Sequence, residues 1–222
     1  MHGLTAVGDI LADYTPLPSS GRSRYDFMTN IGGTATNCAA AASRLGLTTM
    51  LVGRTGNDFM GEYAVDILRD YGVDTSQISR DSERFTAHNF ISLDADGERH
   101  FTFGTRSSAF QQLGLEHIDL DSAFDCRMLY LTGMALVDGP ILATTNSFVR
   151  EARLLGLPVA FDLNYRDPLF SGLSRFQDRV GRILPYISFI KGARDEFEVV
   201  LGTRDLAELG ERLSAAGPEL II

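Results

Sequence analysis

The sequence predicts an α/β protein with a mainly parallel sheet and helices on both of its faces. Short apolar runs alternate along most of the chain with longer amphipathic segments, an order typical of strand and helix units in a parallel sheet. Several of the short runs are apolar throughout, as expected for strands that are buried on both sides. One region, at residues 85–103, instead alternates apolar and polar residues and predicts half-exposed strands.

The N-terminal part begins with a predicted buried strand at residues 4–8, after which Asp9 and Asp13 stand where the strand runs out into a loop. A segment rich in Pro, Ser and Gly follows at 15–24 and predicts a loop. The next predicted elements are a helix at about 34–45, a strand at 50–52 and a helix at about 58–71.

Residues 85–93 and 98–103 predict two strands joined by the sequence Asp-Ala-Asp-Gly at 94–97. An Asp-Gly turn between two alternating runs is a hairpin signal. We expect this hairpin to project from the main sheet as a small β lid, and residues 10–30 are a candidate for part of the same lid.

Strand and helix alternation then resumes. Strands are predicted at 128–132, 158–163 and 187–190, and helices at 139–155, 174–184 and 205–215. The last residues, 218–222, predict the beginning of another buried strand. Because a sheet that stops within a core strand leaves apolar surface and backbone groups uncovered, we expect residues 1–222 to form one domain that is incomplete at its C-terminus.

Composition narrows the class of protein. The formal net charge of −9 and pI of about 4.9 disfavour a general nucleic-acid binder or a partner of anionic membranes. The two cysteines, Cys38 and Cys126, provide neither a disulfide framework nor a metal-ligand spacing. The N-terminus has no basic leader, and no apolar run approaches the roughly 20 residues of a membrane span. We therefore expect a cytoplasmic enzyme or binding protein.

The segment at residues 31–61 is the most informative. Gly32 and Gly33 allow the backbone to come close to a ligand, because no Cβ intervenes. They precede a predicted helix, whose first amide groups lack internal partners. Asn37 lies in the first turn of that helix and offers both a donor and an acceptor. This combination suits a small ligand covered with hydroxyl groups.

The same segment resembles the first signature of the ribokinase-like (PfkB-type) carbohydrate kinase family. The matching positions are Gly32, Gly33, Asn37, Ala39, Leu45, Gly46, Gly53, Gly56, Asp58 and Gly61. The resemblance implies a ribokinase-like fold with a β-hairpin lid. It also implies transfer of the γ-phosphate of ATP to a hydroxyl of a sugar or sugar acid, with Mg²⁺ as the metal, by a homodimer that pairs through the lid. We read the turn at 53–61 as structural, with Asp58 capping the helix that follows.

The resemblance also implies which residues contact the sugar. These are Asp13, with Asp9 as a neighbour, and Gly32, Gly33, Asn37, Arg106, Asn164 and Arg166. In the lid, Asn89, Phe101 and Phe103 are further candidates, although alternation alone does not say which face of the hairpin points inward.

The segment Asp162-Leu-Asn164-Tyr-Arg166 resembles the equivalent one of fructokinases and 2-keto-3-deoxygluconate kinases. Arg166 offers a fixed fork of donors for a carboxylate or a phosphate. This favours a ketose or a keto-sugar acid as the substrate, while adenosine and other nucleosides stay open.

Residues 191–202 fall where the family has Asn-x-x-Glu at the start of a helix. The resemblance implies that Glu196 holds hydrated Mg²⁺ near the phosphates of ATP, and that Lys191 contributes to the ATP site. Ala193 stands at the position of the usual Asn, which is a departure from the family pattern.

Phosphorylation of a hydroxyl requires a base and a polarised cradle for the γ-phosphate. The family supplies both from a later Gly-Ala-Gly-Asp segment, which these 222 residues do not contain. We therefore expect the catalytic Asp beyond Ile222 and no catalytic residue within this chain. The alternative hypothesis is a catalytically inactive sugar-binding fragment without the ATP and anion-hole segment. A nicotinamide dehydrogenase is disfavoured because Gly-x-Gly-x-x-Gly is absent after the first strand.

Overall fold

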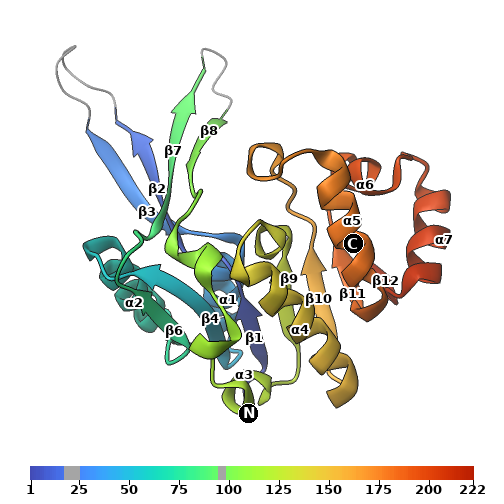
Figure 1. The fold of residues 1–222 in the computed structure, drawn as a ribbon, viewed down its shortest axis with the longest axis horizontal. Coiled ribbons are helices and arrows are strands. Elements are labelled where there is room, and N and C mark those ends of the chain that lie inside the picture. Colours follow the sequence, from blue (N-terminus) through green and yellow to red (C-terminus); the bar gives the residue numbers. More distant parts are fainter. Residues whose placement is uncertain (18–25, 95–98) are drawn as a thin grey trace.

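The computed structural model describes residues 1–17, 26–94 and 99–222. Within these residues, a main sheet of eight strands runs through the molecule (Figure 1) in the order β12-β11-β10-β9-β1-β4-β5, with β6 also paired to β4. Its strands are β1 (Leu4–Val7), β4 (Thr49–Gly56), β5 (Val73–Asp74), β6 (Ile78–Asp81), β9 (Leu129–Thr132), β10 (Val159–Asp162), β11 (Phe189–Lys191) and β12 (Leu220–Ile221). Every pairing between them is parallel.

Helices cover both faces of the main sheet. The longer ones are α1 (Thr34–Arg44), α2 (Phe59–Asp70), α4 (Pro140–Leu155), α5 (Leu173–Ile183), α6 (Arg194–Leu201) and α7 (Leu206–Ala216). Successive residues of a strand point to opposite faces, and the core divides accordingly. Ala6 of β1 packs in a cluster with residues of α1 and α2, whereas its neighbour Val7 packs in a larger cluster with residues of α4 and α5. The predicted α/β class is therefore confirmed.

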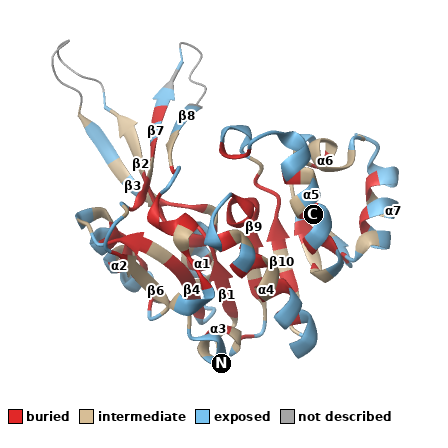
Figure 2. Cartoon of the chain, in the orientation of Figure 1, coloured by how far each residue is buried: buried red, intermediate tan, exposed pale blue. Residues whose placement is uncertain are grey.

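A second sheet, which we call the lid sheet, projects from the main body (Figure 1). It has the strand order β3-β2-β7-β8 and consists of β2 (Leu11–Pro16), β3 (Phe27–Gly32), β7 (Ala87–Leu93) and β8 (Arg99–Gly104). β2 pairs antiparallel with β3 and parallel with β7, and β7 pairs antiparallel with β8. Figure 2 shows buried residues concentrated in the main sheet, while most of the outer part of the lid sheet is exposed or half-buried.

The lid sheet corrects two sequence expectations. Asp13 lies inside strand β2 rather than in a loop, and the predicted loop at 15–24 begins only after Pro16, with residues 18–24 outside the described residues. The segment carries mixed polar side chains without a clear alternation, and its strand character comes from backbone pairing with β3 and β7. The predicted hairpin is present as β7 and β8, and its turn at 95–98 also lies outside the described residues.

The remaining predicted helices and strands are present, although their boundaries differ, and several short elements were not predicted. The first predicted turn glycines, Gly53 and Gly56, lie inside β4, which extends to Gly56 because it pairs with β6 there. Asp58 caps α2 as predicted, since its Oδ1 accepts a hydrogen bond from the backbone N–H of Gly61 at 2.9 Å. Unpredicted elements are β5, β6, α3 (Leu120–Phe124) and the short 3₁₀ turns, of which η1 is Ala109–Gln112 and η3 is Gly133–Leu136. None of the described helices combines the length and the apolar character that crossing a membrane requires.

Candidate functional site

A small cavity of about 170 Å³ lies between the lid sheet and the start of α1. It also receives residues from the segments that follow β1, β9 and β10, so it sits at the carboxyl edge of the main sheet, where open α/β sheets bind ligands. Its wall consists of Asp9, Leu11, Asp13, Gly33, Thr34, Asn37, Asn89, Phe101, Phe103, Met134, Asn164 and Arg166. We call this space the lid cavity. It brings together five of the seven residues expected to contact the sugar.

The two glycines at the cavity are required by close approaches. A Cβ on Gly32 would come within 2.6 Å of Oδ2 of Asp13, and Gly33 has a φ of 111° with its missing Cβ directed at the backbone oxygen of Asp9. Only glycine adopts such a φ without strain. The glycine pair therefore lets the start of α1, β2 and the end of β1 meet around one small space.

Asp9 holds the beginning of α1. Its carboxylate oxygens accept hydrogen bonds from the backbone N–H groups of Thr34, at 2.8 Å, and Ala35, at 3.2 Å. Burial raises the pKa of Asp9, and these amide hydrogen bonds act in the opposite direction. Because both oxygens are engaged by the helix, Asp9 is placed to position the helix terminus beside the cavity.

Asp13 and Asn89 form a polar pair across two strands of the lid sheet. They are register partners on β2 and β7, and Nδ2 of Asn89 donates to Oδ1 of Asp13 at 3.0 Å. Burial raises the pKa of Asp13 against the lowering effect of this bond. Oδ1 of Asn89 is buried and has no hydrogen-bond partner among the described residues. The pair thus carries unused acceptor capacity of the kind that hydroxyl groups of a ligand can fill.

Alternation along the lid strands decides which side chains face the cavity. Asn89 on β7 and both Phe101 and Phe103 on β8 line it, with the two phenyl rings stacked at a centroid distance of 5.9 Å. This resolves the orientation that the sequence left open. An apolar ring pair beside two polar side chains is typical of small-molecule sites.

The loop after β10 supplies the opposite wall. Asn164 is buried with a φ of 33°, and its Nδ2 donates to Oγ1 of Thr34. Arg166 is exposed, and its Nη1 donates to the backbone oxygen of Tyr165 at 3.2 Å. Asn37, also exposed, completes the wall from the first turn of α1. Thr34 was missed by the sequence reasoning, and nothing but its place after Gly33 could have indicated it.

Arg106 is not brought to the lid cavity. Its Nη2 donates to the backbone oxygen of Pro168 at 3.3 Å, and it lines a separate hollow of about 380 Å³ with residues such as Gln111 and Asp138. Gly32 is buried behind Gly33 and does not line the cavity wall, although its backbone permits the approach of Asp13.

A larger polar cleft of about 480 Å³ adjoins the lid cavity. The two spaces share Thr34, Asn164 and Arg166. The rest of the cleft is lined by Asp162, Tyr165, Lys191, Ala193, Asp195, Glu196 and Val199. A ligand in the lid cavity would therefore lie next to one in the cleft, with Arg166 at the junction.

Lys191 and Glu196 both line the cleft, and both already have protein partners. Nζ of Lys191 donates to Oδ2 of Asp162 at 2.8 Å. Glu196 accepts from the backbone N–H of Tyr165 through Oε1 and from that of Ala193 through Oε2, each at 2.8 Å. Ala193 begins α6 without a capping side chain.

The donor set of the cleft fits a phosphate ligand with hydrated Mg²⁺. Lys191 and Arg166 supply positive charge for phosphate oxygens. No group of three His, Cys, Asp or Glu side chains able to hold a metal occurs within the described residues. Mg²⁺ commonly keeps its waters and binds through phosphates and one or two carboxylates, and each oxygen of Glu196 retains one lone pair for a metal-bound water.

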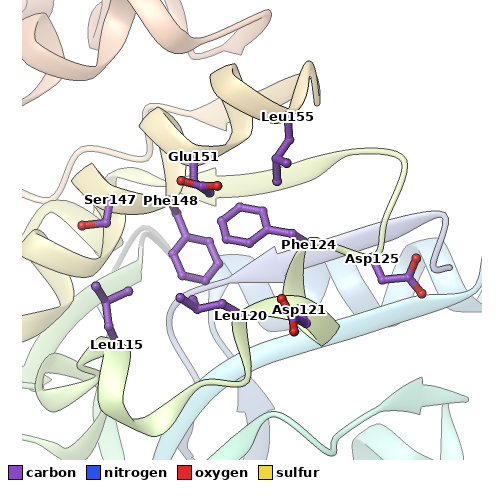
Figure 3. A pocket seen from close by; sticks show the side chains of 9 residues that line it. All are labelled: Leu115, Leu120, Asp121, Phe124, Asp125, Ser147, Phe148, Glu151 and Leu155. Atoms are coloured by element: carbon purple, nitrogen blue, oxygen red, sulfur yellow. The ribbon is translucent and has the colours of Figure 1, made fainter.

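A larger hollow lies elsewhere. Figure 3 shows it around the rings of Phe124 and Phe148, whose centroids are 4.8 Å apart. It measures about 640 Å³, is bordered by α3 and α4, and shares no lining residue with the lid cavity or the polar cleft. Size alone therefore does not identify the candidate site; the gathering of polar groups at the carboxyl edge of the sheet does.

Comparison with known proteins finds similarity along the whole chain. The model of a family described as pfkB family carbohydrate kinase matches residues 1–222. A fructokinase from Vibrio alginolyticus is 26% identical over 222 residues, which cover 100% of this chain and 70% of that protein. The chain spans only 57–62% of the length of plant fructokinases to which it is 28 or 29% identical.

Two solved structures extend the comparison. The fructokinase of Xylella fastidiosa with bound ATP has a TM-score of 0.90 and 26% identity, covering 100% of this chain and 71% of that one. The fructokinase of Vibrio cholerae O395 in a form with fructose, ADP and calcium bound has a TM-score of 0.83 and 27% identity, covering 96% of this chain and 68% of that one.

Proposed function

This chain belongs to the pfkB family of carbohydrate kinases, and we propose that it acts as an ATP-dependent kinase that transfers the γ-phosphate to a hydroxyl of a sugar. The observation that carries the proposal is the junction of the lid cavity and the polar cleft at Thr34, Asn164 and Arg166. Two adjoining spaces of this kind can hold a sugar hydroxyl beside a phosphate chain, which is the arrangement that phosphoryl transfer needs.

The sugar would occupy the lid cavity. Asp13 and Asn89 would exchange hydrogen bonds with its hydroxyl groups, and Asn37 and Asn164 would contact it from the other wall. Phe101 and Phe103 would cover its apolar face and exclude water from the reacting hydroxyl. Among sugars we propose a ketose such as fructose, because the relatives are named fructokinases; a keto-sugar acid is the second choice, with Arg166 as the partner of its carboxylate.

The phosphates of ATP would occupy the polar cleft, with Lys191 and Arg166 facing their charge. Mg²⁺ would neutralise the phosphates and help to align them, held through water by Glu196. The resemblance assigns removal of the hydroxyl proton to an Asp in a Gly-Ala-Gly-Asp segment, which these 222 residues do not contain. The residues described above therefore account for binding and orientation. Similarity to named kinases favours this function over that of a sugar-binding fragment without activity.

A homodimer through the lid is also part of the proposal, in a cytoplasmic protein. The face of the lid sheet opposite the cavity carries a cluster of aromatic rings, Tyr14, Phe27, His88 and Phe90, with centroid distances between 5.3 and 6.4 Å. Phe90 is 42% exposed, and an exposed apolar patch of this kind is typical of an interface.

Sedimentation equilibrium tests the dimer. We expect the wild-type chain to sediment as a dimer and Phe90→Glu as a monomer. Phe59→Glu, on the exposed surface of α2, serves as the matched control and should remain dimeric. A monomeric wild type would contradict this part of the proposal.

A sugar panel tests the function itself. The chain is incubated with Mg-ATP and with D-fructose, 2-keto-3-deoxygluconate or adenosine, and ADP formation is measured. A parallel thermal-shift series omits ATP, because a sugar at a hundred times its Kd stabilises the folded state by about 2.7 kcal/mol, or about 5–10 °C for a chain of this size. Because residues 1–222 contain no Gly-Ala-Gly-Asp segment, stabilisation by the ketose is the result expected of these residues, and ADP formation with the ketose is expected of a chain that also carries that segment. The proposal is contradicted if no member of the panel stabilises the chain and none leads to ADP formation.

A further inference from the structure

Glu196 connects two backbone segments that are distant in sequence. Its Oε1 accepts from the N–H of Tyr165, in the loop after β10, and its Oε2 accepts from the N–H of Ala193, at the start of α6. Both distances are 2.8 Å. Since a carboxylate offers acceptors at both of its oxygens, one side chain satisfies both amides at once.

The loop that Glu196 holds is the one that reaches the lid cavity. Tyr165 stands between Asn164 and Arg166, which both line the cavity and the polar cleft. Asn164 has a φ of 33°, a left-handed conformation that asparagine adopts more readily than most other residues besides glycine but that is still uncommon. Contacts with the surrounding structure help to hold the loop in this conformation.

Two contacts hold this conformation, one from α1 and one from α6. The side chain of Asn164 donates to Oγ1 of Thr34 on α1, and the amide that follows Asn164 donates to Glu196 on α6. The ring of Tyr165 is anchored separately, against Phe176 at a centroid distance of 4.6 Å and by a bond of 2.7 Å from its hydroxyl to Asp167. The ring contacts keep the loop in place, whereas the bond to Glu196 fixes the direction of the peptide unit next to Asn164.

We propose that Glu196 is a positioning residue for sugar binding, which orients Asn164 and Arg166 toward the lid cavity in the absence of metal and nucleotide. This inference rests on the proposed function, because it takes the lid cavity as the sugar site. It gives Glu196 a task besides the expected contact with metal-bound water. The sugar and phosphate spaces are thereby connected through one side chain.

Glu196→Gln is the sharpest substitution because it preserves size. A glutamine amide has one acceptor oxygen, and its nitrogen would face a second N–H donor. One of the two backbone bonds is therefore lost. Glu196→Asp retains the charge but is one methylene shorter, so that it cannot reach both amides. Asp195→Asn is the matched control, since Asp195 lines the same cleft and is exposed but makes no hydrogen bond to a described backbone amide.

The first measurement is titration calorimetry with D-fructose, without ATP or metal, on the wild type and the three variants. We expect Glu196→Gln and Glu196→Asp to weaken binding roughly tenfold, the effect of losing one hydrogen bond to a charged group, and Asp195→Asn to change it less than about twofold. If Glu196 only bound metal, or only stabilised the fold, its substitution would leave the Kd of the folded chain for fructose unchanged. Unaltered affinity in both Glu196 variants would overturn the inference.

The second measurement is hydrogen exchange at the amide of Tyr165, which does not depend on the sugar. We expect roughly tenfold faster exchange in Glu196→Ala, which leaves neither amide an acceptor, and wild-type exchange in Asp195→Asn. If the wild type binds no fructose, the sugar assignment fails, and the exchange of the Tyr165 amide decides whether Glu196 holds the loop. Unchanged protection of this amide in a folded Glu196→Ala protein refutes the inference. If Glu196→Gln does not fold, Glu196→Asp supports the calorimetry.

Discussion

Asp13→Asn should raise the stability of the protein while it weakens ligand binding. Burial raises the pKa of Asp13, although the bond from Asn89 acts to lower it. A carboxyl with a raised pKa contributes stability below its unfolded-state pKa of about 4 and loses that contribution as the pH rises through its folded-state pKa. At pH 7 the charged side chain therefore opposes folding.

The size of both effects follows from the hydrogen bonds that the asparagine retains and from the charge that it lacks. Its Oδ1 can still accept the 3.0 Å bond from Nδ2 of Asn89, and no volume changes. Because the carboxyl is half-exposed, solvent screens part of its cost, and we expect a gain of about 0.5–1 kcal/mol in the free energy of unfolding at pH 7. The loss of a charged acceptor for a sugar hydroxyl should weaken fructose binding by about ten- to a hundredfold.

Urea denaturation followed by far-UV circular dichroism, at pH 7 and pH 4, measures the first effect, and titration calorimetry measures the second. The stability gain should shrink at pH 4, where Asp13 of the wild type begins to be protonated. Asp178→Asn removes an exposed carboxylate paired with Arg182 and should leave both quantities nearly unchanged. An Asp13→Asn protein that is less stable than the wild type at pH 7, or that binds fructose equally well, refutes the reasoning.

Three further substitutions test local features of the fold by urea denaturation. Asp58→Ala should lower the free energy of unfolding by about 2 kcal/mol, because it removes the cap of α2 and the 2.7 Å bond from the amide of Thr86 at the base of the lid; a loss below about 0.5 kcal/mol would contradict it. Gly33→Ala should lower the free energy of unfolding by about 2–3 kcal/mol, because the φ of 111° at this position directs a Cβ at the backbone oxygen of Asp9. If the variant is as stable as the wild type, the backbone relaxes and the expectation is wrong. Phe148→Ala should cost about 3–5 kcal/mol by opening a void under α4, and it should leave fructose affinity unchanged because the ring lies outside the lid cavity.

The main sheet was predictable because its strands are local apolar runs. β1 is buried throughout and β9 nearly so, and their apolar sequences therefore report their environment directly. β2 and β3 were not predictable in the same way. They contain mixed polar and apolar residues. They form strands because β2 pairs with β7, which lies more than seventy residues further along the chain.

The residues of the candidate site were likewise predictable only in part. Asn37 and Gly33 were predicted from a spaced motif and Asp13 from its place after the first strand, and the structure places all three around one cavity. The position of Arg106 could not be obtained from spacing, since it depends on where the end of β8 meets the turn at Pro168. The two amide contacts of Glu196 also have no sequence signal, because their partners are backbone groups.

The most direct test of the central claim is a map of hydrogen exchange with and without D-fructose. We expect fructose to slow exchange in the segments that line the lid cavity, at 9–13, 33–37, 87–91, 101–103 and 164–166. We expect no change at 115–125, beside the apolar hollow of Figure 3. Protection confined to the second region, or absent everywhere at saturating fructose, would contradict the assignment of the lid cavity as the sugar site.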